Sequence, residues 1–166
     1  LKPVEEDRLR TMVERLRQLV ASYPTASEPR LALARYNLGK GQPAEALSLL
    51  GALDDTQKKE PAVMSLTAAA QLSQNQHDAA KATIDRLVTL QPNVAQHHYQ
   101  LAIALAGLGD TAGMRKELEK TLELDPKHFP GRIAMARTLL TARDEEAFEA
   151  QVKVLRAGLL WASIAV

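Results

Sequence analysis

The sequence contains no cysteine, which excludes disulfides, thiolate nucleophiles and cysteine metal sites. Aromatic residues make up only 4% of the chain, so any interior must be built from its many Leu and Ala side chains. Neither sign of charge is in excess, because 21 Lys and Arg stand against 20 Asp and Glu and leave a formal charge of +1. The charge therefore gives no reason to expect nucleic acid or an anionic lipid surface as a partner.

Long hydrophobic runs are also missing. No stretch approaches the roughly 18 apolar residues that a membrane-spanning helix needs. The first ten residues carry Glu5, Glu6 and Asp7 and lack the apolar run of a signal peptide. We expect no membrane insertion by this segment, and any export signal of the parent protein would lie outside it.

What the sequence does contain is a repeat of 34 residues. Four blocks align without a gap, beginning at Ser27, Pro61, Ala95 and Phe129. Their eighth residues are Ala34, Ala68, Ala102 and Ala136. The twentieth are Ala46, Ala80, Met114 and Phe148, and the twenty-fourth are Leu50, Ile84, Leu118 and Val152. Position 27 holds Leu53, Leu87, Thr121 and Leu155. These positions are mostly small or aliphatic, with Phe148 and the polar Thr121 as departures, and their common register predicts a repeated interior.

Each block has the pattern of two helices separated by a short break. In the third block, apolar residues at helical spacing run to Leu105, and Gly107 to Asp110 then interrupts them. A glycine can take the left-handed conformation that ends a helix, and Asp110 can cap the next one by accepting a backbone N–H. Pro92 and Pro126 at position 32 predict the end of each hairpin.

These marks resemble the tetratricopeptide repeat family, whose pattern has small residues at positions 8 and 20, an apolar residue at 24 and proline at 32. The resemblance implies an all-α fold, a right-handed α-solenoid of about four helical hairpins with an N-terminal helix and a C-terminal apolar tail. The expected repeats are 27–60, 61–94, 95–128 and 129–162. Residues 1–26 are expected to form the second helix of a truncated repeat, and 163–166 the start of a further repeat or a cap.

In that family the concave wall of the solenoid is lined by positions 2, 5, 9 and 12 of the first helices, and a peptide or protein binds there. Carried over to this chain, the first two blocks supply Glu28, Leu31, Arg35, Leu38, Ser65, Ala69 and Leu72. The third and fourth supply Gln96, Tyr99, Ile103, Ile133, Arg137 and Leu140. The resulting groove suits a peptide with apolar side chains and one or two carboxylates, which arginine can bind with paired hydrogen bonds.

Two functions stay open at this point. In the first, the chain is a protein-interaction scaffold, with Leu31, Leu38 and Ile133 available to a partner. In the second, it is a structural spacer that binds nothing, with those side chains packed on neighbouring helices and Arg35 and Arg137 simply solvated. The residues themselves indicate neither the partner nor an oligomeric state.

An enzyme is not expected, and neither is a cofactor or metal. His97 and His98 are adjacent, so they point about 100° apart on a helix and cannot easily share one ion. His77 and His128 fall in connections, where surface or packing roles are the common ones. No pair of His or acidic residues has the spacing of metal ligands, and the Gly-containing breaks are explained by helix ends rather than by phosphate binding.

A finer resemblance concerns residues 124–137, Leu-Asp-Pro-Lys-His-Phe-Pro-Gly-Arg-Ile-Ala-Met-Ala-Arg. This run looks like long bacterial repeat lipoproteins associated with exopolysaccharide and PEP-CTERM protein sorting. It implies a parent protein in the periplasm or attached to a membrane; without it a cytoplasmic location is expected.

Overall fold

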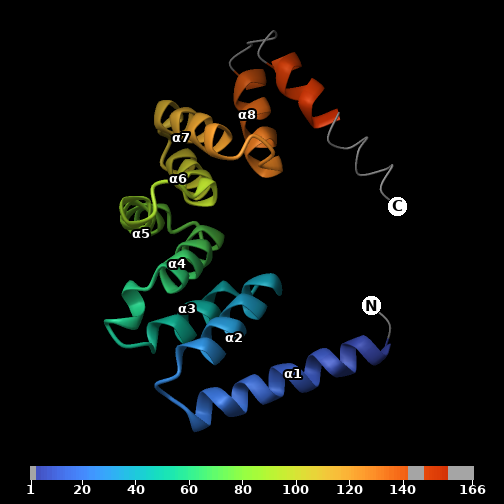
Figure 1. Cartoon of the computed structure of the whole chain (residues 1–166), viewed down its shortest axis with the longest axis vertical. Coiled ribbons are helices and arrows are strands. Elements are labelled where there is room, and N and C mark those ends of the chain that lie inside the picture. Colours follow the sequence, from blue (N-terminus) through green and yellow to red (C-terminus); the bar gives the residue numbers. More distant parts are fainter. Residues whose placement is uncertain (1–2, 142–147, 157–166) are drawn as a thin grey trace. The chain divides into compact units, whose positions relative to one another are not determined.

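The structure is a computed structural model that describes residues 3–141 and 148–156. The described residues are helical and contain no β-strand (Figure 1). Following α1 (Pro3–Ser22), the helices are α2 (Ser27–Gly39), α3 (Pro43–Gly51), the 3-10 helix η1 (Gln57–Lys59), α4 (Pro61–Ser73), α5 (His77–Leu90), α6 (Ala95–Gly107), α7 (Thr111–Leu124) and α8 (Phe129–Thr141). Residues 148–156 are also helical.

The helix starts follow the repeat. Helices α2, α4, α6 and α8 begin at the same residues as the four sequence blocks. The apolar tail at the C-terminus, including 163–166, lies outside the described residues, as does part of the expected repeat 129–162. The structure also divides into two compact units, Leu1–Leu90 and Gln91–Val166. The division follows the last residue of α5, so it falls between the second and third hairpins, near the end of the expected repeat 61–94.

The hairpin turns have one geometry in three blocks. Position 15 takes a positive φ each time, at Gly41 (72°), Asn75 (57°) and Gly109 (79°). The next residue then donates its N–H back into the preceding helix, as Asp110 does to the Leu105 carbonyl at 2.9 Å. Asp110 also accepts from the Gly113 N–H at 2.8 Å and so caps α7, which confirms that prediction.

In the first unit, α2 packs against α3 and α4 against α5 to form two hairpins, and α3 packs against α4 to join them. Helix α1 packs against α2. The core combines repeat positions from consecutive elements, and its buried members are Ala34, Ala46, Leu50, Leu53, Val63 and Ala70. Small side chains at the crossings allow the helices to approach closely, as the repeat predicts.

In the second unit, α6 and α7 form a hairpin and α7 packs against α8. Ala102, Leu118, Met135 and Leu139 form its core. Gly131 brings α8 close to α7, because a Cβ there would lie 3.1 Å from the Thr121 Cγ2 atom. In both units, the alanines at position 8 are buried.

Candidate functional site

The predicted lining positions of the first unit lie on α2 and α4, which contact each other. Glu28 and Arg35 are exposed on α2. The other predicted residues are half-buried, namely Leu31, Leu38, Ser65, Ala69 and Leu72. Leu31 and Leu38 also pack against the core cluster, so part of each side chain already has a structural role. The face therefore offers exposed charge beside partly accessible apolar groups.

In the second unit, the predicted residues lie on α6 and α8. Gln96, Ile103, Arg137 and Leu140 are exposed, and Tyr99 and Ile133 are half-buried. Ile103 and Leu140 are among the large apolar side chains that remain exposed in the described chain. This face is thus the more apolar of the two, and Arg137 is its exposed cation.

His128 contacts two of these residues, Gln96 and Tyr99. Its Nδ1 atom accepts a hydrogen bond from the Gly131 N–H at 3.0 Å, so it acts as an N-cap for α8. With Nδ1 accepting, the neutral ring carries its hydrogen on Nε2, which donates to the Gln96 Oε1 atom at 3.1 Å. The ring also lies 4.9 Å from that of Tyr99, centroid to centroid. The sequence predicts only that His128 lies in a connection, but its position directly before the first residue of a helix is the signal for a cap.

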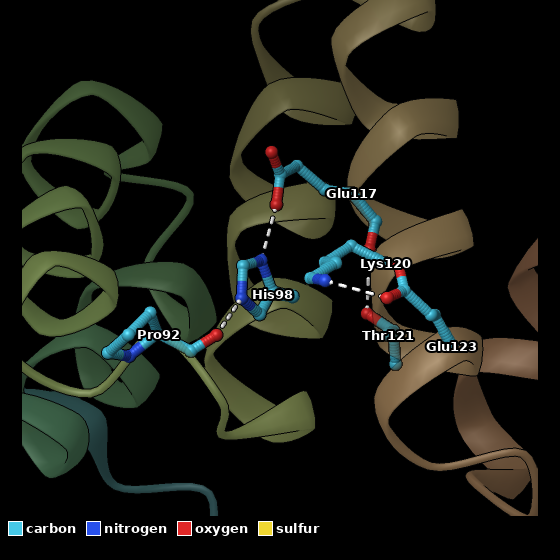
Figure 2. A network of polar contacts seen from close by, with 6 residues as sticks. All are labelled: Pro92, His98, Glu117, Lys120, Thr121 and Glu123. Atoms are coloured by element: carbon cyan, nitrogen blue, oxygen red, sulfur yellow. Dashed lines mark hydrogen bonds and ion pairs between the residues drawn. The ribbon is translucent and has the colours of Figure 1, made fainter.

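His98 has a packing role of a different kind, shown in Figure 2. The buried ring bridges two oxygens, with Nδ1 at 2.7 Å from Glu117 Oε2 and Nε2 at 2.8 Å from the Pro92 carbonyl oxygen. These contacts join α6 to α7 and to the segment before α6. Thr121 Oγ1 donates to the Glu117 carbonyl one turn away, at 2.8 Å. The network is structural, because both ring nitrogens are engaged within the protein.

His97 is also buried, and its Nε2 atom lies 3.0 Å from Gln91 Oε1. Burial lowers the pKa of His97 below the usual value, and the neighbouring His98 acts in the same direction. The folded chain therefore favours a neutral His97 ring. It faces an amide and not a carboxylate, so it is not part of an acid–base pair.

The described residues contain no cluster of ligands for a metal ion. No group of three or more His, Asp or Glu residues converges among them. A cleft between the start of α7 and the end of α8 is lined by Thr111, Ala112, Met114, Arg115, Arg137, Thr138 and Thr141. That lining has no His, Asp or Glu side chain that could act as a general base. Of the helices that the structure describes, none is long and apolar enough to span a bilayer.

Comparison with known proteins agrees with the hairpin geometry. Family profiles of the tetratricopeptide repeat match residues 37–106 and 95–128, which together span more than half of the chain. The chain belongs to the tetratricopeptide repeat family. Such repeats typically form protein-interaction modules and are usually non-catalytic. No curated protein sequence gives a match.

Solved tetratricopeptide repeat structures share the fold at low sequence identity. MamA 41-end from Desulfovibrio magneticus RS-1 is 15% identical with a TM-score of 0.75, over 89% of this chain and 84% of that one. The protein TTC0263 from Thermus thermophilus is 18% identical with a TM-score of 0.73, over 92% and 84%. The first tetratricopeptide repeat domain of human RPAP3 is 17% identical with a TM-score of 0.63, over 71% and 93%. The prediction of an all-α fold of consecutive hairpins is confirmed.

Proposed function

We propose that this chain is a protein-interaction scaffold that binds a peptide or protein segment over the exposed faces of its first helices. The proposal is supported by a contrast in exposure between two faces of those helices. Every predicted lining residue is exposed or half-buried, whereas the position-8 alanines of the same helices are buried. The first helices thus use one face for the core and leave the other accessible.

The chemistry of these faces favours an apolar segment that carries carboxylates. Ile103 and Leu140 offer exposed aliphatic surface, which loses contact with water when a partner covers it. Arg35 and Arg137 are exposed and form no ion pair with any side chain that the structure describes. Each guanidinium is therefore available for a partner carboxylate.

The test compares proteins retained by the immobilised native chain with those retained by an Arg35→Glu, Ile103→Glu, Arg137→Glu variant. Tyr99 is left unchanged because it packs against the core and the His128 ring. A second variant, Leu90→Glu with Leu108→Glu, replaces exposed leucines outside the lining positions. All three chains should keep the same melting temperature.

A protein retained by the native and Leu90/Leu108 chains but lost from the triple variant would support the proposal and name the partner. Retention of the same protein by all three chains would place its binding elsewhere. Retention by none would favour the alternative, a structural spacer without a ligand. The resemblance of residues 124–137 to bacterial repeat lipoproteins adds a proposed setting, a parent protein in the periplasm or attached to a membrane.

A further inference from the structure

Helix α1 packs like the second helix of a hairpin whose first helix is absent from the described chain. It lies against α2 just as α3 lies against α4 and α7 against α8 (Figure 1). Helices α3 and α7 each have a second neighbour, the first helix of their own hairpin, which is α2 or α6, and α5 packs against α4 in the same way. Among the described residues, α1 has no such hairpin partner.

The repeat register identifies the side of α1 that is left uncovered. One repeat length before Ala46, Leu50 and Leu53 stand Met12, Leu16 and Leu19. At these positions, Ala46 and Leu50 in α3 are 0% and 2% exposed, and Leu53, two residues after the end of α3, is 3% exposed. In α5, Ala80, Ile84 and Leu87 are all at 0%. In α1, Met12 is 61% exposed, Leu19 is 42% exposed and Leu16 is half-buried. The same positions thus form hairpin interiors in α3 and α5 and an open surface in α1.

The uncovered residues form a continuous seam. Met12, Leu16, Leu19 and Tyr23 follow one another at intervals of four, three and four, which places them on one face of a helix. Tyr23, directly after the helix end, is exposed as well. Val13, about 100° around the helix from Met12, is buried instead. The seam therefore lies beside the side of α1 that is already covered.

Two arginines border this seam on its other edge. Arg8 and Arg15 are exposed and seven residues apart, so they lie on the same side of the helix. Their neighbours Arg10 and Arg17 are paired with Asp7 at 3.1 Å and Glu14 at 3.5 Å. Arg8 and Arg15 pair with no side chain that the structure describes. The border is positively charged and open to a partner.

We propose that the α1 seam binds an amphipathic α-helix that presents small and aliphatic side chains to Met12, Leu16 and Leu19 and carboxylates to Arg8 and Arg15. The hairpins show which apolar chemistry suits these positions, since Ala34 shares a buried cluster with Ala46, Leu50 and Leu53. This surface is separate from the faces of the first helices and goes beyond the proposed function.

The experiment uses two fluorescein-labelled peptides based on residues 27–39, the sequence of α2. The acidic peptide keeps Glu28 and carries Arg35→Glu; the basic peptide carries Glu28→Lys and Arg35→Lys. Both changes fall at positions that are exposed in α2, so the apolar face is the same in both. Binding to the full chain is followed by fluorescence anisotropy at low salt, where charge pairing is strongest.

We expect saturable binding of the acidic peptide, at least tenfold tighter than that of the basic one. The chain with Met12→Glu and Leu19→Glu should lose at least tenfold in affinity. Leu90→Glu with Leu108→Glu is the matched control, because those leucines are 59% and 40% exposed and lie outside α1. The chain with Arg8→Glu and Arg15→Glu should reverse the preference between the peptides.

Three results would overturn the proposal. Neither peptide saturating up to about 1 mM would mean that the seam holds no helix of this kind. The peptide would bind to the first-helix faces if the Arg35, Ile103, Arg137 variant lost binding while the Met12, Leu19 variant kept it. That result would leave the proposed function standing. The third result is sedimentation showing that the native chain is a dimer and that the Met12→Glu, Leu19→Glu variant is a monomer. The seam would then bind a second copy of the chain.

Discussion

Enlarging a position-8 alanine gives a direct test of the close helix crossing. Ala68 lies on α4, which packs against both α3 and α5, and its exposure is 0%. Leucine at this site adds three carbon atoms where no free surface remains. Overpacking of this kind costs about 1 to 3 kcal/mol of folding free energy.

That cost translates into a measurable shift. For a chain of this length, each kcal/mol lowers the melting temperature by about 2 to 4 °C, so Ala68→Leu should lower it by about 2 to 12 °C. Ala62→Leu is the control, because Ala62 is exposed on the same helix and the change in helix propensity is similar. A surface substitution of this type should stay within about 0.5 kcal/mol.

The measurement is thermal unfolding followed by circular dichroism of the helical signal. If Ala68→Leu melted at the same temperature as Ala62→Leu, the position would have room for a larger side chain. The repeated alanines would then not be what permits the close crossing of the helices, even though the helices themselves would remain.

Two further substitutions test local features of the second unit. Gly131→Ala should destabilise the chain by about 1 kcal/mol or more, because its Cβ would lie 2.9 Å from His128 Nδ1 and 3.1 Å from Thr121 Cγ2. Gly39→Ala, with nothing within 4 Å, should instead gain up to about 1 kcal/mol; equal effects in denaturant titrations would contradict this. His97 has a lowered pKa when folded, so the unfolded chain takes up its proton first as the pH falls below 6.5. The stability that the neutral His97 ring contributes to the folded chain is fully present above that pH and is lost below it. The melting temperature should therefore fall less between pH 7.5 and 5.5 in His97→Gln than in the native chain. An equal fall in both chains would refute the assignment.

Local signals in the sequence predict most of the hairpin geometry. Gly41 and Gly109 stand where a positive φ is needed, and the helix breaks could be placed from them. Asn75 adopts the same conformation in the second block, as this residue type tolerates it better than most. Asn75 is a weaker sequence signal for a turn than glycine, because asparagine also occurs in many other settings.

Side-chain contacts across the fold were harder to predict. Nothing in the spacing of His97 and His98 distinguishes a ring that bridges Glu117 and Pro92 from one on the surface, because the partners lie on other elements. The same holds for Tyr99, which was predicted to line a groove and also packs against the core and the His128 ring. Residue type and the repeat period predict the face of a helix on which a residue lies. The element that packs against that face then decides the role of the residue.

The α1 seam shows this dependence most clearly. Leu16 and Leu50 are the same residue at the same repeat position, and both lie within a helix, yet Leu16 is half-buried and Leu50 only 2% exposed. The difference cannot come from the side chain or the helix, so it comes from the presence of α2 beside α3 and the lack of a corresponding helix beside α1 among the described residues. In a repeat fold, each hairpin covers apolar surface through its neighbours. An unpartnered second helix is therefore a surface whose binding chemistry is specified by the other repeats of the same chain.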